Sequence, residues 1–220
     1  TNTMAANTGS YNTAVGGIAL DSNSSGSNIV AIGYAALQAN TSAAGQVAVG
    51  VESLTLNQSG GENTAVGYQT LMTQISAGHM NTALGYKAGR LNLSGQSLTA
   101  IGFKALEANT SADGNTAVGQ QALVVTTTGP YNTAVGMSAG LRVTTGNSNT
   151  LLGQEAGQRV TTGAGNVAVG RGCLMFTTTG SSNIAIGYNT AQNTTGNDNV
   201  AIGHDALLNN TSGVKNVAVG

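Results

Sequence analysis

A short run of aliphatic and β-branched residues, closed by a glycine, recurs along the whole chain. Ten of the twelve intervals between these glycines are 17 residues, one is 18 (Gly67 to Gly85) and one is 16 (Gly187 to Gly203). A fixed period of this length is typical of repeat proteins, in which small units stack and share one core. The pattern therefore predicts about thirteen stacked coils and a function that resides on a long surface. The closing glycines are Gly16, Gly33, Gly50, Gly67, Gly85, Gly102, Gly119, Gly136, Gly153, Gly170, Gly187, Gly203 and Gly220.

The three residues before each glycine predict a short strand. We number the closing glycine place 0 and count onward to place 16. Place 14 is β-branched and place 16 is aliphatic in every unit, while place 15 is alanine in all units but one, which has Leu151. Such short β-branched runs, bounded by glycine, are typical of strands. We therefore expect one strand of the type Asn-Thr-Ala-Val-Gly in each coil.

Strand geometry separates these residues into two faces. Places 14 and 16 point one way and places 13 and 15 the other. We assign the aliphatic place 16 to the interior of the coil, which leaves the flat alanine face for another sheet or subunit. Place 13 is asparagine in ten units, with Ile29, Gln46 and Leu98 as the exceptions. Because stacked amides can hydrogen-bond from one strand to the next, an asparagine ladder is expected along the stack.

The other half of each unit reads roughly Gly-Tyr-x-Ala-Leu-x-x-Asn-Thr-Thr-Gly and predicts a bend or a second short strand. Place 3 is small, and place 4 exchanges leucine for glycine, as at Gly89. We assign serine or threonine to place 9 throughout, including Thr195. Arg90 and Glu107 both fall at place 5 of successive units, so this frame predicts a surface ion pair between them.

Together these features predict an all-β fold: a parallel β-solenoid or β-roll of 17-residue coils, forming a single repeat domain over residues 1–220. The repeat runs to both ends without the polar cap that solenoids use, so we expect a fragment of a longer fibrous chain. Cys173, the one cysteine, excludes an internal disulfide and is expected to be a small buried thiol.

The composition narrows the classes of partner that the chain is expected to bind. Only 7% of the residues are charged and the net charge is -1, which gives no support for nucleic acid or an anionic membrane as a partner. No stretch approaches about eighteen consecutive apolar residues, so we expect no membrane insertion by this segment.

The sequence offers no arrangement of residues suited to catalysis. His79 and His204, the two histidines, fall at different places in units far apart. The phosphate-binding Gly-Lys-Ser/Thr ending and the calcium-binding nonapeptide are both missing. We therefore expect a protein that is not an enzyme, with no catalytic, cofactor-binding or metal-binding residues and no cofactor. The acidic residues are scattered over the coils: Asp21, Glu52, Glu62, Glu107, Asp113, Glu155, Asp198 and Asp205.

The strand phrase resembles the head repeat of YadA-like trimeric autotransporter adhesins, and also repeat segments of phage tail fibres. It is seen in residues 12–16, 63–67, 132–136 and 166–170. The resemblance implies a left-handed parallel β-roll, three chains along a common axis, and a role in display or adhesion. The adhesin repeat is shorter, and the Asn-Thr-Thr-Gly half has no counterpart in it.

The interpretation we favour is a structural or adhesive shaft or head segment of an extracellular fibre, at a cell surface or on a virion. Its expected partners are copies of itself, as a homotrimer or filament, and a host-surface receptor or glycan. Two alternatives stay open. Residues 118–123 fit one turn of the hexapeptide repeat of left-handed β-helix acyltransferases, and threonine columns at places 8 and 9 could form an ice-binding array.

Overall fold

The computed structural model describes residues 7–75 and 79–220. It divides into two compact units, Thr1–Gly114 and Asn115–Gly220. The N-terminal unit contains β1 (Thr13–Val15), β2 (Val30–Ile32), β3 (Val47–Val49), β4 (Thr64–Val66), β5 (Thr82–Leu84) and β6 (Thr99–Ile101). The C-terminal unit contains β7 (Thr116–Val118), β8 (Thr133–Val135), β9 (Thr150–Leu152), β10 (Val167–Val169), β11 (Ile184–Ile186), β12 (Val200–Ile202) and β13 (Val217–Val219).

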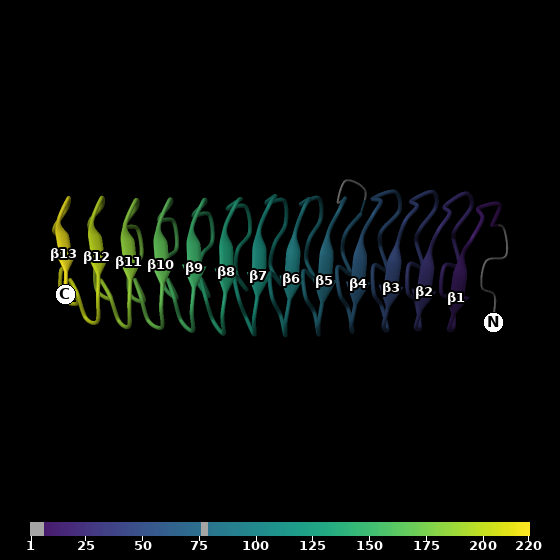
Figure 1. Cartoon of the computed structure of the whole chain (residues 1–220). Helices are drawn as coiled ribbons and strands as arrows, with labels where there is room; N and C mark the ends of the chain where they lie inside the picture. The colour runs from purple at the N-terminus through teal and green to yellow at the C-terminus, as the bar shows by residue number, and fades with distance from the viewer. Residues whose placement is uncertain (1–6, 76–78) are drawn as a thin grey trace. The chain divides into compact units, whose positions relative to one another are not determined.

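Within each unit the strands stack in chain order as a parallel β-solenoid (Figure 1). Each strand occupies places 14 to 16, and its residues pair with their equivalents one coil away, as Ala31 does with Ala48. The residues that the structure describes contain no helix. The all-β parallel solenoid expected from the 17-residue period is thereby confirmed.

The two irregular intervals leave the register unchanged, because Thr64 pairs with Thr82 and Ile184 with Val200. In the 16-residue coil, the Thr195 N–H donates to the carbonyl of Thr211 at 2.8 Å. The backbone N–H at place 8 makes this bond in other coils, as Thr144 does to Thr161. Thr195 therefore occupies place 8, and this coil has no residue at place 9. The assignment of Thr195 to place 9 was therefore wrong.

The alanine at place 15, not the aliphatic residue at place 16, faces the interior. Ala134 and Ala168 are fully buried, whereas Val135 is 40% exposed. Where place 4 is a buried leucine, such as Leu123, the interior opposite is filled and place 15 holds only alanine. The expectation that place 16 lines the interior was wrong, although the separation of the two faces was correct.

Turns, rather than a second strand, form the other half of each described coil. Residues at places 2, 4 and 12 adopt a left-handed backbone, including Lys104 (φ 57°), Leu106 (φ 51°) and Ser148 (φ 56°). A side chain at this φ is disfavoured by roughly 1–2 kcal/mol. The contacts between coils must offset that cost, because every turn also packs Leu or another interior residue against its neighbours.

The one departure from alanine at place 15 shows how tightly the interior is filled. A Cβ added at Gly140 would lie 2.9 Å from Cδ1 of Leu151, and one at Gly157 would lie 2.6 Å from its Cδ2. Both glycines occupy place 4, where most coils have leucine. The large side chain at Leu151 therefore takes the volume that leucines would have filled.

We expect Leu151→Ala to destabilise the C-terminal unit by about 2–3 kcal/mol, because it opens a cavity between two glycines. Adding Gly157→Leu should recover much of the loss by restoring the usual alanine and leucine pairing. Gly157→Leu alone should be at least as harmful as Leu151→Ala, because its side chain overlaps Leu151. Chemical unfolding of the three variants, followed by circular dichroism, measures their stability. A double variant that loses as much stability as Leu151→Ala alone would contradict the prediction.

An asparagine ladder at place 13 ties successive coils together inside the C-terminal unit, as expected from the sequence. Oδ1 of Asn149 accepts hydrogen bonds from the backbone N–H and from Nδ2 of Asn166, both at 3.0 Å. Nδ2 of Asn149 in turn donates to the Gly163 carbonyl at 2.9 Å. Each buried amide thus satisfies groups in its neighbour, as buried polar atoms require. The ladder includes Asn132, Asn149, Asn166, Asn183, Asn199 and Asn216.

Candidate functional site

The outward side of the strands forms an uncharged surface that we call the outer sheet face, made by places 14 and 16. All its residues are threonine, valine, isoleucine or leucine. Ile184, Ile186 and Ile202 are among its exposed members. Because side chains of one place lie in register along a unit, the face presents parallel rows of β-branched and aliphatic groups. Such an exposed apolar surface is typical of an interaction site.

A column of stacked rings lies at place 1 of the N-terminal unit. Tyr68 and Tyr86 stack with their ring centroids 5.4 Å apart, and Tyr86 and Phe103 at 5.3 Å. The Lys87 ammonium lies 5.0 Å from the centroid of Tyr86. Both faces of the Tyr86 ring are covered by its neighbours, so the column stiffens the coils and cannot stack the face of that ring against a ligand.

Charges at places 2 and 5 of the N-terminal unit compensate one another. Arg90 Nε lies 3.1 Å from Glu107 Oε1, and Lys104 Nζ lies 3.3 Å from Glu107 Oε2. The ion pair expected from the shared place is confirmed, and with it the repeat frame. Glu107 is therefore engaged by two cations and is a poor candidate for an acid or base.

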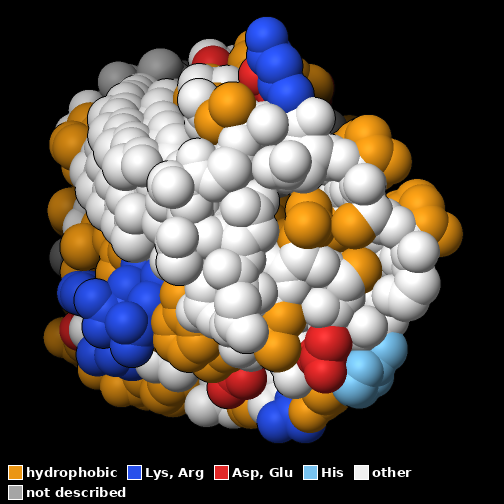
Figure 2. Space-filling model, turned by 90° about the vertical axis from the view of Figure 1, so that its left-hand side faces the viewer, with side chains coloured by type: hydrophobic (Ala, Val, Ile, Leu, Met, Phe, Trp, Pro, Cys, Tyr) orange, Lys and Arg blue, Asp and Glu red, His pale blue; other side chains and the backbone are white. Residues whose placement is uncertain are grey.

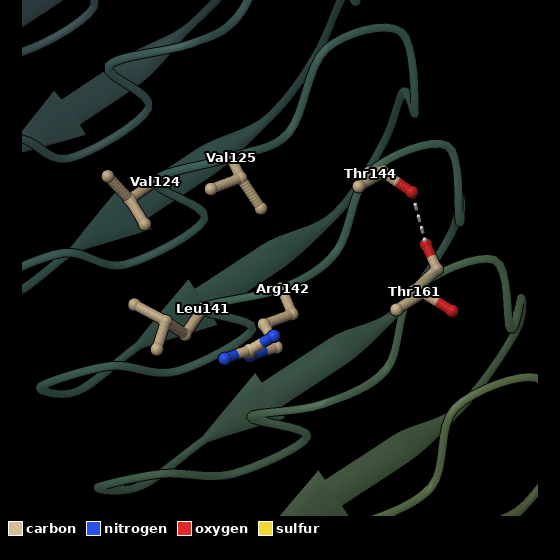
Figure 3. Close-up of a pocket in the computed structure, with 6 residues that line it drawn as sticks. All are labelled: Val124, Val125, Leu141, Arg142, Thr144 and Thr161. Atoms are coloured by element: carbon tan, nitrogen blue, oxygen red, sulfur yellow. Dashed lines mark hydrogen bonds between the residues drawn. The ribbon is translucent and has the colours of Figure 1, made fainter.

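A recess on the C-terminal unit places a cation among apolar side chains. We call it the Arg142 recess; it has a volume of about 470 Å³ and is lined by Val124, Val125, Leu141, Arg142, Thr144 and Thr161. The residues come from places 5, 6 and 8 of three successive coils (Figure 3). Looking from the β13 end, Figure 2 shows Lys and Arg side chains gathered against hydrophobic ones on one side of the molecule.

Arg159 continues the cationic column one coil beyond Arg142. The backbone N–H of Arg142 donates to the Gln158 carbonyl at 2.9 Å, and the backbone N–H of Arg159 donates to the Met175 carbonyl at the same distance. The Arg159 guanidinium lies 5.0 Å from the centroid of the Phe176 ring, which restrains it through a cation–π contact. None of the ion pairs among the described residues involves Arg142 or Arg159.

The two histidines have separate local contacts. His79 Nδ1 accepts the Gly61 N–H at 2.9 Å. His204 stacks on Tyr188 with ring centroids 5.2 Å apart, and its Nδ1 lies 3.2 Å from Asp205 Oδ2. Among the described residues, no three His, Cys, Asp or Glu side chains lie close enough together to hold a metal ion.

Cys173 is buried, as the sequence indicated. Burial raises the pKa of its thiol, which disfavours the thiolate and with it nucleophilic reactivity. Its Sγ contacts the Gly187 carbonyl of the next coil. Thr190 occupies the same place in the next coil, and its hydroxyl makes the same kind of contact, donating to the Gly203 carbonyl at 2.6 Å. The Cys173 thiol thus plays the part that a threonine hydroxyl plays in that coil.

The threonine column at place 8 uses its hydroxyl groups to join coils. Oγ1 of Thr144 donates to the Thr161 carbonyl at 3.1 Å, and Oγ1 of Thr161 donates to the Thr178 carbonyl at 3.0 Å. The hydroxyl protons are thus engaged, while the oxygen lone pairs stay available to accept. This arrangement weakens the case for an ice-binding array at places 8 and 9, because the hydroxyl donors of place 8 are already bonded.

The Arg142 recess was missed from the sequence, although a signal for it existed. Arg142 and Arg159 are 17 residues apart, and Val125 precedes Arg142 by the same interval. The shared place 6 could have identified a cationic column that begins beside an apolar pair. No protein-family model matches the chain, and none of the curated proteins matches it either. Within the described residues, no helix has the length and apolar character needed to span a membrane.

Proposed function

We propose that the chain is a structural and adhesive segment of an extracellular fibre, and that copies of it associate through the outer sheet face. The supporting observation is that places 14 and 16 carry no charged residue in any of the thirteen repeats. Exposed aliphatic rows lose their contact with water when another sheet covers them, which stabilises the assembly by roughly 25 cal/mol for each Å² of apolar surface buried.

A second copy of the same chain suits this surface well. Two sheets pack face to face when the side chains of their surfaces interdigitate. A partner with the same coil spacing can repeat each contact along the unit, and the chain itself has that spacing. Homomeric assembly, with three chains as the arrangement implied by the resemblance to adhesin heads, is the form we propose for the fibre.

Sedimentation velocity at micromolar concentration tests the proposal. We expect an oligomer, and we expect Val169→Lys with Ile186→Lys to shift it toward monomer, because two charges would be buried in an apolar interface. Thr145→Lys with Thr162→Lys, at exposed turn positions, is the matched control and should leave the sedimentation coefficient unchanged. A monomeric parent chain would rule out assembly through this face.

Ice binding is a second candidate, supported by a different threonine column from the one at places 8 and 9. At place 14, Thr64, Thr82 and Thr99 lie in register on the outer sheet face of the N-terminal unit. Thr116, Thr133 and Thr150 do so in the C-terminal unit. Thermal hysteresis, the difference between the melting and freezing temperatures of ice in the protein solution, separates the two functions. We expect none from a fibre segment, and a clear difference would favour ice binding.

A further inference from the structure

We infer that the Arg142 recess, together with Arg159, binds a carboxylated saccharide. The inference rests on the proposed adhesive function and names the class of ligand that this part of the surface would take. It starts from charge: Arg142 and Arg159 are exposed, and no ion pair among the described residues neutralises either one. In the N-terminal unit, by contrast, Arg90 is paired with Glu107.

The spacing of the two guanidinium groups suits a ligand that extends along the unit. Arg142 and Arg159 occupy the same place in successive coils, and parallel strands lie about 4.8 Å apart. Guanidinium groups bind carboxylates through two parallel hydrogen bonds. One arginine can hold a carboxylate in this way while the other contacts the same group or the next one along the ligand.

The rest of the recess supplies what a sugar ring requires. Val124, Val125 and Leu141 form an apolar wall beside Arg142 (Figure 3), against which the C–H face of a ring can pack. Thr144 and Thr161 donate their hydroxyl protons to backbone carbonyls. Their Oγ1 lone pairs can therefore accept hydrogen bonds from sugar hydroxyl groups.

An acidic peptide fits this surface less well. Extended peptides gain affinity by adding a strand to an open sheet edge. Here the backbone amides are already bonded to the next coil: the Arg142 N–H to the Gln158 carbonyl and the Thr144 N–H to the Thr161 carbonyl, both at 2.9 Å. A peptide would have only its carboxylate side chains to offer, whereas a saccharide uses the cations, the acceptors and the apolar wall together.

Isothermal titration calorimetry of the full chain with trigalacturonic acid tests the inference. We expect weak binding, with a Kd between about 10 μM and 1 mM for so shallow a site, and affinity that falls as salt is raised. The neutral trisaccharide in which every carboxyl group has been reduced to a hydroxymethyl group should bind at least tenfold more weakly. Arg142→Gln with Arg159→Gln should lower the affinity for the acid at least tenfold.

Two controls separate a lost site from a lost fold. Arg171→Gln with Lys215→Gln removes the same charge at other places and should bind like the parent chain. Both double variants should keep the parent's thermal unfolding midpoint, because all four substituted residues are exposed. Equal binding of the acidic and neutral sugars, unchanged binding by the Arg142 and Arg159 variant, or tighter binding of heptaglutamate than of the sugar would each overturn the inference. Sedimentation of the parent chain reports on assembly separately, so an oligomeric parent chain that binds no acidic sugar would refute this inference alone.

Discussion

Gly136→Asn should destabilise the C-terminal unit by on the order of 4 kcal/mol, the sum of backbone strain and overpacking. Gly136 has φ +137°, and a Cβ built on it would lie 2.5 Å from the Gly153 carbonyl oxygen and 2.6 Å from its carbon. Both atoms belong to the backbone of the next coil, so no side-chain rearrangement can relieve the overlap. Urea unfolding followed by circular dichroism measures the loss.

Gly165→Asn is the matched control, because it introduces the same side chain at another glycine of positive φ. The nearest atom to a Cβ at Gly165 is Ser182 Oγ at 3.9 Å, an ordinary contact. Ser148 and Ser182, at the same place of the neighbouring coils, already adopt φ values of 56° and 57°. We expect a change within about 0.5 kcal/mol. If both variants unfold at the same urea concentration, close approach of the coils is not what requires glycine at place 0.

Asn166→Asp should cost about 4 kcal/mol at neutral pH, because it places a buried carboxylate where an amide donated. Nδ2 of Asn166 donates to the Gly180 carbonyl at 2.9 Å and to Asn149 Oδ1 at 3.0 Å. An aspartate would present oxygen to both of these acceptors. Asn147→Asp, at an exposed turn position, is the control and should change the stability little.

The pH dependence of Asn166→Asp distinguishes charge from lost hydrogen bonds. Burial among acceptors should raise the pKa of the introduced carboxyl above its unfolded value of about 3.9. Folding then favours the protonated form, so the penalty is small below the unfolded pKa and grows as pH rises toward the folded one. We expect the stability gap between variant and parent to be smaller near pH 4 than at pH 7. A gap independent of pH would assign the loss to the missing donors alone.

The strands were predictable from the sequence because their signal is local. β-branched and aliphatic residues at places 14 and 16, closed by glycine, identify the three residues of every strand, from Thr13–Val15 to Val217–Val219. The shared place of Arg90 and Glu107 also fixed the register of successive coils. Both features depend on the spacing along the chain alone, which a strict repeat makes visible.

The inward and outward faces were not predictable from hydrophobicity. A row of alanines and a row of valines are both apolar, and the larger residues would ordinarily be placed inside. Interior volume decides the matter here, and its signal lies in exchanges between distant places. At Gly157, a Cβ would lie 2.6 Å from Cδ2 of Leu151, and its other two nearest atoms also belong to Leu151, so side chains at place 15 and place 4 compete for the same space.

The Arg142 recess escaped prediction for a related reason. It depends on side chains from three coils whose individual turns look unremarkable in the sequence, and on the contrast between paired and unpaired charge. Only the structure shows that Arg90 has a carboxylate beside it and that the cationic column of Arg142 borders an apolar wall.

The unchanged strand pairing across intervals of 16 and 18 residues has an evolutionary consequence. The strands on either side of each length change pair as they do elsewhere, so the next coil meets the same pairing partners as before. Duplicating or deleting whole units by recombination would therefore give products whose remaining coils still fit together. A gene of this kind can lengthen or shorten its product where the joined coils have alanine at place 15 and leucine at place 4, whereas a junction at Leu151 also needs glycine at place 4 of the next coil.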